Sequence, residues 1–268
     1  MKAMKKCGAI TTIAGLLLAL SGCSTNAGWN YVPSPARVAS KQAPVSLAVA
    51  HFQDQRGSEN SYYRWLCAFP LVPYCTSTYD RPDAANGFLT VAAYSFRPTD
   101  DLAEAAALEL RQTGMFRDVF VTDKTVDPGA PLMLHGTIQS TKWNGATYTY
   151  LLGPYGPLLW LFGLPIGSAT NALALHLELA DVASGRVLWT QDISQNYSIT
   201  ETYYSNFNKD FGYPTMFRDG MAPAVTSLES WVASQPQDYW TKLQPAATTP
   251  PAATPVPAAA PAPARHPE

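Results

Sequence analysis

Cysteine is the residue type in this chain whose spacing suggests chemistry. The sequence has four cysteines: Cys7 and Cys23 lie in or directly after an N-terminal apolar run, and Cys67 and Cys75 lie close together. A thiol can be acylated, can bind a metal or can form a disulfide. A metal site would need further ligands, and the four histidines are scattered, at positions 51, 135, 176 and 266. We therefore expect no metal and no cofactor.

Motifs for catalysis are missing from the sequence. It contains no Gly-x-Ser-x-Gly nucleophile elbow, no phosphate-binding glycine loop, no His-Glu-x-x-His and no supported cysteine–histidine pair. A glycan-cleaving enzyme would need two converging carboxylates, a geometry that sequence spacing does not decide. We predict no catalytic residue, and a peptidoglycan- or glycan-active enzyme is the alternative.

The composition narrows the class of protein. Of the 268 residues, 47% are hydrophobic and 14% are charged, against roughly 25% charged in an ordinary soluble domain. Aromatic residues make up 12% of the chain, which is enough to build a core. Lysine and arginine number 18 against 20 acids, so no basic surface for nucleic acid is expected.

The N-terminal residues have the order of a secretory signal. Lys2, Lys5 and Lys6 form a basic start, residues 8–20 are uncharged and mostly apolar, and Leu20-Ser21-Gly22-Cys23 closes the run. The apolar run is shorter than the roughly 20 residues that cross a bilayer. Together these features resemble the leader and lipobox of bacterial lipoproteins.

This resemblance implies that the leader is cleaved between Gly22 and Cys23, and that Cys23 carries a diacylglycerol and an acylated amino group. Ser24, rather than Asp, follows the cysteine, which by the same resemblance implies the outer membrane. Each buried CH₂ contributes about 0.8 kcal/mol, so several acyl chains anchor a protein stably. We expect a lipid-anchored protein that faces the periplasm; an ordinary secretory signal or a buried apolar helix is the alternative.

In that compartment, Cys67 and Cys75 are expected to form a disulfide. They are the cysteines left once Cys7 is removed and Cys23 is acylated, and they flank a short loop with two prolines. A close, even pair in an oxidising environment favours a bond. By the chain-entropy relation, closing so small a loop contributes about 2–3 kcal/mol. Two separate buried thiols are the alternative.

Composition divides the chain into four parts. We expect a signal peptide over 1–22, a lipidated tether over 23–44, a periplasmic domain over 45–243 and a disordered tail rich in Pro and Ala over 244–268. The tail is interpreted as an inert solubilising segment or as a spacer that threads peptidoglycan.

Hydrophobic periodicity in the domain predicts an α+β fold. Strands are expected at 45–52, 116–122 and 132–141 and in a long hairpin from about 173 to 199. Helices are expected at 99–111 and 216–232, the latter bent or restarted at Pro223. Residues 53–86 are interpreted as a long loop, and residues 88–96 as a strand or a helical start. This order favours a single domain in which two main helices pack on a mixed or antiparallel sheet.

Short motifs in the domain resemble a group of periplasmic lipoproteins. A first strand runs into Phe-x-Asp-x-Arg at 52–56, a helix closes with Leu-Arg-Gln-Thr-Gly-Met-Phe at 110–116, and residues 135–138 and 181–189 fit a strand and a hairpin. The group includes the curli-secretion lipoprotein, the lipoprotein activators of penicillin-binding proteins and the N-terminal domain of the Tol translocation protein. The resemblance covers about 45–199, and the insertion that holds the cysteine pair departs from it, so no partner is carried over.

Asp54 and Arg56 lie just past the first predicted strand. There a carboxylate can accept backbone N–H groups and an arginine can pair with it. We expect a structural turn lock; a clasp that faces a partner is the alternative.

Between Lys142 and Glu178 the sequence has no charged residue, and residues 150–167 are strongly apolar. Three prolines and four glycines there argue against a continuous membrane-spanning helix. We predict an apolar loop between two strands, either packed as core or exposed as a contact with a partner or a membrane. The candidate contact residues are Leu158, Leu159, Trp160, Leu161 and Phe162.

These expectations combine into a non-enzymatic, lipid-anchored adaptor or accessory subunit in envelope biogenesis or secretion. Its membrane contact is through the acyl chains on Cys23, and an envelope protein is the expected, unidentified partner. The apolar loop or the tyrosine-rich segment 197–213 would engage that partner, helped by the high local concentration that anchoring gives. An assembly or pore component similar to the curli-secretion lipoprotein is a further alternative.

Overall fold

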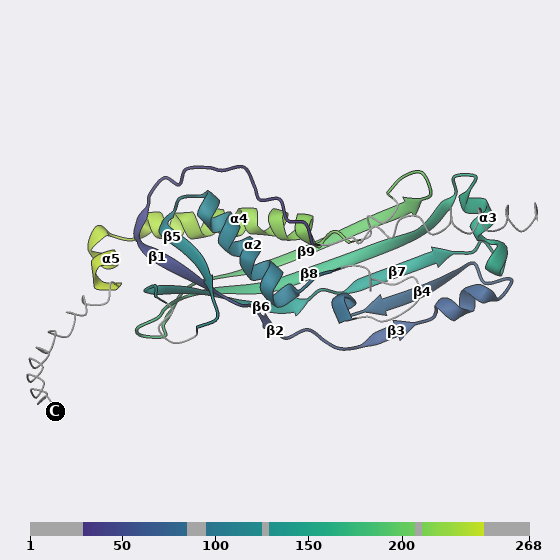
Figure 1. The fold of residues 1–268 in the computed structure, drawn as a ribbon, viewed down its shortest axis with the longest axis horizontal. Helices are drawn as coiled ribbons and strands as arrows, with labels where there is room; N and C mark the ends of the chain where they lie inside the picture. Colours follow the sequence, from purple (N-terminus) through teal and green to yellow (C-terminus); the bar gives the residue numbers. More distant parts are fainter. Residues whose placement is uncertain (1–28, 85–94, 125–128, 207–210, 244–268) are drawn as a thin grey trace, which may run out of the picture.

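A computed structural model describes residues 29–84, 95–124, 129–206 and 211–243 of the chain (Figure 1). The predicted signal peptide, its Leu20–Cys23 motif and the tail over 244–268 lie outside these ranges. So do most of the segment 88–96 and the start of the turn at 127–129. The lipidation site Cys23 and the cleavage position after Gly22 therefore stay predictions.

One mixed sheet of nine strands forms the body, as the α+β prediction requires. The strands are β1 (Ala43–Ala50), β2 (Gln53–Asp54), β3 (Asn60–Tyr62), β4 (Tyr74–Tyr79), β5 (Phe116–Thr122), β6 (Leu132–Ser140), β7 (Trp143–Tyr148), β8 (Pro165–Asp181) and β9 (Val187–Thr202). The helices are η1 (Arg64–Ala68), η2 (Pro82–Ala84), α2 (Pro98–Gln112), η4 (Gly153–Tyr155), α3 (Pro157–Trp160), α4 (Tyr213–Ser234) and α5 (Gln237–Leu243).

Strand β8 runs along the long axis of the molecule. One of its edges pairs with β9 along nearly its whole length, which confirms the predicted hairpin. The other edge pairs with β7 over residues 167–171 and with β6 over 174–181. The parallel strands β1 and β5 extend the sheet beside β6, and the antiparallel strands β4 and β3 extend it beside β7. The result is an elongated sheet with a different set of strands at each end (Figure 1).

The two main helices cover one face of the sheet at the end that holds β1 and β5 (Figure 1). Alternate residues of β8, from Leu173 to Leu179, are buried beneath them, while His176 and Glu178 lie on the other face. Helix α2 begins with Pro98, and Asp100 and Asp101 occupy its first turn. Carboxylates are stabilising there because they interact favourably with the positive end of the helix dipole. The predicted helix 99–111 is therefore confirmed.

Helix α4 runs as one element through Pro223, so the restart expected there does not occur. The helix continues because apolar side chains on both sides of the proline, Met221, Ala224 and Val225 among them, are buried in the same core. The short helix α5 was not expected from the sequence. Its Trp240 is fully buried in the main core.

The interpretation of 53–86 as a long loop is wrong, because this segment contains β2, β3 and β4. Strand β4 pairs with β7 through a register that places Cys75 opposite Thr147. Its sequence, Tyr-Cys-Thr-Ser-Thr-Tyr, has little hydrophobic alternation, so its strand character comes from this long-range pairing.

The expected tether is packed against the body over its described part, 29–42. Tyr31 Oη donates to Glu109 Oε1 at 2.5 Å, and the Ser34 backbone nitrogen donates to the same oxygen at 2.8 Å. Farther along, the Ser40 nitrogen donates to Glu229 Oε1 at 2.9 Å. These contacts with α2 and α4 leave only residues 23–28 as a connection between Cys23 and the body.

Within the described residues, no helix combines the length and the apolar character that crossing a membrane requires.

Candidate functional site

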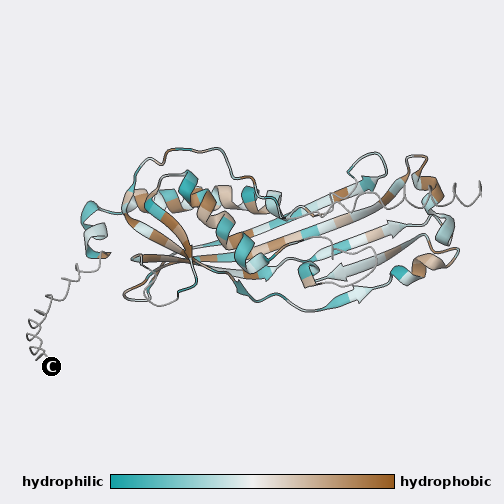
Figure 2. Cartoon of the chain, viewed as in Figure 1, coloured by the Kyte–Doolittle hydropathy of each residue, from teal (hydrophilic) through white to brown (hydrophobic). Residues whose placement is uncertain are grey.

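The end of the sheet that α2 and α4 do not cover carries an exposed apolar surface, which we call the apolar tip. It is formed by β3 and η1 with the loop that follows, by the η4–α3 segment, and by the end of β9 (Figure 1). Figure 2 shows hydrophobic residues at this end, far from the main core. The exposed side chains that define the tip are Tyr62, Tyr63, Trp65, Phe69, Leu71, Tyr74, Leu151, Leu152, Tyr155, Leu158, Leu161, Phe162, Tyr203 and Tyr204.

Backbone bonds join the loops of the tip. The Leu71 nitrogen donates to the Leu151 carbonyl at 2.8 Å, and the nitrogens of Thr149 and Tyr150 both donate to the carbonyl of Pro73, at 2.9 and 3.1 Å. The hydroxyl of Thr149 donates to the carbonyl of Val72. Two segments that lie far apart in the sequence thus form one unit.

A disulfide ties the same unit to the sheet. Cys67 in η1 is bonded to Cys75 in β4, the pairing predicted from the sequence. The bond closes the loop that carries Phe69 and Leu71, so the position of these exposed side chains is fixed at both ends of the loop.

The tip holds backbone conformations that L-residues adopt at a cost. Leu71, Tyr150 and Leu151 have φ values of 69°, 56° and 67°, each costing about 1–2 kcal/mol. Gly153 also has a positive φ, and a Cβ placed on it would lie 2.9 Å from the carbonyl carbon and oxygen of Phe69. Such strained conformations persist where surrounding contacts hold them in place, and they are concentrated at functional sites.

Polar atoms of the tip's aromatic side chains point back to the backbone. Tyr150 Oη donates to the Pro165 carbonyl at 2.7 Å, and Trp160 Nε1 donates to the Tyr148 carbonyl at 3.0 Å. Burial raises the pKa of the Tyr150 hydroxyl, so it keeps its proton as a donor. In the same way, Tyr204 Oη donates to the carbonyl of Leu161 at 2.6 Å. These three polar groups are therefore paired within the protein, and the exposed Leu and Phe side chains of the tip present hydrocarbon to solvent.

Of the five contact residues predicted from the sequence, Leu158, Leu161 and Phe162 are exposed, and Phe162 is 80% exposed. Leu159 and Trp160 are half-buried, because the Trp160 indole turns toward the sheet. The predicted apolar loop is therefore an exposed surface and not core.

Sequence reasoning missed the share of the disulfide loop in this surface. Phe69 and Leu71 belong to the run Ala-Phe-Pro-Leu-Val-Pro-Tyr between the cysteines. The apolar character of this run is evident from the sequence, but its position in the fold is not. The tyrosine-rich segment 197–213, the other predicted contact, supplies Tyr203 and Tyr204 to the same tip.

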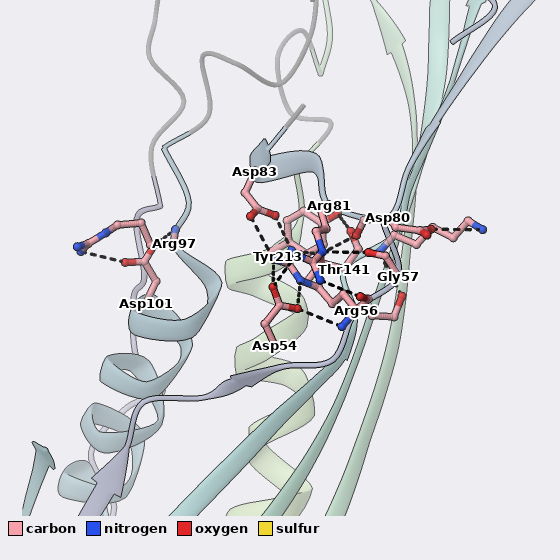
Figure 3. A network of polar contacts seen from close by, with 12 residues as sticks. Asp54, Arg56, Gly57, Asp80, Arg81, Asp83, Arg97, Asp101, Thr141 and Tyr213 are labelled. Atoms are coloured by element: carbon pink, nitrogen blue, oxygen red, sulfur yellow. Dashed lines mark hydrogen bonds and ion pairs between the residues drawn. The ribbon is translucent and has the colours of Figure 1, made fainter. Parts of the chain in front are cut away.

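Arg56 is the buried centre of an ion cluster with Asp54 near the middle of the sheet (Figure 3). The Arg56 side chain is 3% exposed; its Nε lies 2.9 Å from Asp54 Oδ1, and its Nη1 lies 2.5 Å from Asp83 Oδ1. Nη1 also donates to Thr141 Oγ1 at 2.6 Å, and the Thr141 carbonyl accepts the Tyr213 hydroxyl at 2.7 Å. Thr141 is at the junction of β6 and β7, so the cluster joins the two halves of the sheet to α4.

This geometry fits the predicted turn lock. Burial opposes the charge of Arg56, but the hydrogen bonds that it donates to Asp54 and Asp83 outweigh burial and raise the pKa of the guanidinium. The hydrogen bond from Arg56 in turn lowers the pKa of Asp54. Because the guanidinium is buried and fully engaged, it offers no surface to a partner.

The histidines of the described chain that make ion pairs do so on the surface. His51 lies between Asp100 and Asp123, at 2.8 and 2.6 Å, and His176 lies between Asp192 and Glu178, at 2.6 and 3.0 Å. No group of three or more His, Cys, Asp or Glu residues within the described ranges is placed to hold a metal ion.

One hollow of about 410 Å³ brings two carboxylates near aromatic rings. Asp101 and Glu104 of α2 line it together with Trp29 and Tyr31. Burial raises the pKa of Asp101, yet its Oδ2 accepts the Arg97 backbone N–H at 2.7 Å. Asp101 therefore already has a structural role, because it satisfies a free donor at the start of α2.

Comparison with known proteins gives weak likenesses. No protein-family model and no curated protein matches the sequence. Among solved structures, a crystal structure of protein XCC0632 from Xanthomonas campestris is similar at 14% identity and a TM-score of 0.36, covering 76% of this chain and 92% of that one. The PelC dodecamer from Paraburkholderia phytofirmans is similar at 14% identity and a TM-score of 0.32, covering 71% and 93%.

A third similar structure is lipoprotein GNA1162 from Neisseria meningitidis, with 15% identity and a TM-score of 0.23, covering 69% of this chain and 99% of that one. At identities and TM-scores this low, a likeness carries no argument about what this chain does.

Proposed function

We propose that the chain is a lipid-anchored outer-membrane lipoprotein that faces the periplasm and acts without catalysis, as an adaptor or accessory subunit in envelope biogenesis or secretion. The observation that carries the proposal is the apolar tip, in which a disulfide and bonds between loops hold exposed Leu, Phe and Tyr side chains in place. Exposed apolar patches of this kind mark interaction surfaces.

Anchoring and the tip act together in this proposal. The lipid on Cys23 holds the body at a membrane, and the packing of residues 29–42 on α2 and α4 keeps the connection short. A short connection raises the effective concentration of the tip toward anything at the same membrane, so a contact of modest affinity suffices.

The test of the adaptor role is complementation in a strain that lacks the protein. The variants are Cys23→Ser, the tip variant Leu158→Ser/Phe162→Ser and the matched control Val187→Ser, which changes an apolar residue that is 46% exposed at the opposite end of β9. We expect the control to restore envelope integrity and the other two to fail at normal protein abundance. Full restoration by the tip variant would remove the tip from the function.

A glycan-active enzyme is the second candidate, favoured by the hollow beside Asp101 and Glu104. The purified protein is incubated with peptidoglycan, with Glu104→Gln as the matched variant. We expect no release of soluble fragments by either form. Release that depends on Glu104 would make the protein a hydrolase and would contradict the non-enzymatic role.

A further inference from the structure

We infer that the apolar tip enters the interfacial region of the membrane that holds the lipid on Cys23, so that the protein is attached to that membrane at two points. The inference rests on the proposed lipidation and adds a second contact, made by the folded body itself.

The side chains of the tip suit the boundary between lipid and water. Tyr and Trp are enriched at that boundary, where an apolar ring and a polar end are both satisfied. The segment 150–164 contains no charged residue, and the charged residues of the other tip segments are Arg64 in 62–74 and Glu201 at the end of β9. By contrast, the outer faces of α2 and α4 carry exposed acids such as Glu104 and Asp219, and the open face of β9 carries Asp192.

The backbone of the tip is also prepared for loss of water. A loop that leaves bulk water for the boundary with lipid loses hydrogen-bond partners for its N–H and C=O groups, so internal pairing lowers the cost of entry. Besides the bond from Leu71 to Leu151, the nitrogen of Phe162 donates to the carbonyl of Leu159 at 3.1 Å. These internal bonds reduce the number of backbone groups that would lose a water partner on entry.

The length of chain before the body sets how near the membrane must lie. Trp29 stacks on Phe96, which stacks on Tyr213, and Tyr213 bonds to Thr141 beside the middle of β8. The six residues from Cys23 to Trp29 reach at most about 20–22 Å.

From the level of Thr141, the sheet continues to the tip for a comparable distance. The backbone carbonyl of Lys142 accepts the N–H of Ala172 in β8. Strand β8 begins seven residues before Ala172, at Pro165. At about 3.3–3.4 Å per residue, this stretch is about 23 Å long. The fully extended connection is about as long as this stretch, so the tip and the acyl chains reach the same membrane surface when the connection runs toward the tip.

The test is photocrosslinking of the lipidated full-length protein in vesicles of phosphatidylethanolamine and phosphatidylglycerol. A benzophenone amino acid replaces Phe162 at the tip or, as the matched control, Val187 at the other end of β9. We expect lipid adducts at position 162 and only background at position 187. The pair Leu158→Ser/Leu161→Ser, added to the protein with the probe at 162, is expected to reduce these adducts several-fold, because it removes apolar contact without changing the connection.

Several outcomes would overturn the inference. Equal lipid adducts at both positions, or adducts at 162 that persist in the serine variant, would mean proximity without insertion. Adducts to a second copy in the vesicles would make the tip an interface between copies. In native envelopes, protein adducts at 162 in place of lipid adducts would make it a docking surface for another protein. Membrane fractionation separates failure of the anchor: a protein found in the membrane fraction without lipid adducts at 162 retains the proposed anchoring and loses only the second contact.

Discussion

The backbone nitrogen of Leu71 donates a 2.8 Å hydrogen bond to the carbonyl oxygen of Leu151, and both residues have a left-handed backbone. Each would relax in isolation, because L-residues leave this conformation at a gain of about 1–2 kcal/mol. Their side chains are 80% and 50% exposed. The bond thus holds two strained loops in the arrangement that displays apolar side chains.

Loss of the disulfide is expected to destabilise the protein by about 2–3 kcal/mol, because the reduced unfolded chain regains loop entropy. The variant is Cys67→Ser/Cys75→Ser, and the measurement is the free energy of unfolding in urea. Reduction of the unmodified protein should give the same change. Agreement between the oxidised protein and the double variant would contradict a stabilising role for the bond.

Gly153→Ala is expected to cost more than Gly163→Ala. Both glycines have a positive φ, of 55° and 88°, so each alanine carries the cost of a left-handed backbone, roughly 1 kcal/mol. At Gly153 the new Cβ would also lie 2.9 Å from the Phe69 carbonyl, whereas at Gly163 nothing lies within 4 Å.

The comparison of thermal midpoints for these two variants isolates the close approach of the loops. Equal midpoints would show that the loops are not in contact in solution, which would leave the tip without its main support.

The elements that could be predicted from the sequence are those whose signal is local. Alternation of Leu173, Leu175 and Leu177 identifies β8, and a proline followed by acids identifies the start of α2. Each pattern reflects one buried face, so the fold class and the two main helices followed from it.

The rest depended on pairings between distant segments. Strand β4 is polar, and its place in the sheet comes from β7. The composition of residues 23–44 is that of a linker and predicts a tether. The bond between Tyr31 and Glu109, which are 78 residues apart, instead holds the described part of this segment against the body. The same holds for the apolar tip. Its apolar segments can be recognised in the sequence, but their assembly at one end of the sheet depends on long-range pairing and could not be predicted.

Arg56→Met is expected to lower the free energy of unfolding by about 1.5–3 kcal/mol, because Asp54 and Asp83 would lose the guanidinium that hydrogen-bonds to both carboxylates. The control is Arg97→Met, whose side chain is 71% exposed in its pairs with Asp100 and Asp101; a surface pair of this kind contributes about 1 kcal/mol or less. Equal losses in urea unfolding would contradict the structural role of the cluster.

The same variant should change the acid limb of stability. Arg56 lowers the pKa of Asp54 in the folded protein, so this carboxylate contributes stability above its unfolded pKa, and the contribution is lost as pH falls through the folded pKa. Without Arg56 the folded pKa rises, and this pH-dependent loss should disappear from the stability profile below about pH 4.

His176 is expected to make the protein less stable as pH rises above the ordinary histidine pKa of about 6.5. The hydrogen bond to Asp192 raises the pKa of His176 above 6.5, so its contribution is complete below the unfolded pKa and is lost as pH rises through the folded one. The measurement is the free energy of unfolding between pH 5.5 and 8.5, on the order of one and a half units either side of neutrality.

His176→Gln should flatten this decline, and Asp192→Asn should flatten it in part, because Glu178 remains within 3.0 Å. A decline that is unchanged in both variants would assign the pH dependence to other groups.

Glu109→Ala is expected to release residues 29–42 from the body. Glu109 is 4% exposed and accepts the Tyr31 hydroxyl and the Ser34 nitrogen, and loss of a buried charged acceptor costs about 1.5–3 kcal/mol. Release should expose Arg37 and Lys41 to trypsin, so cleavage there under native conditions should become faster, while Glu109→Gln, which keeps an acceptor oxygen, should remain largely protected. If trypsin cut the unmodified protein at these two sites as fast as it cuts the unfolded chain, this segment would be free after all, and the short connection that brings the apolar tip to the membrane would not exist.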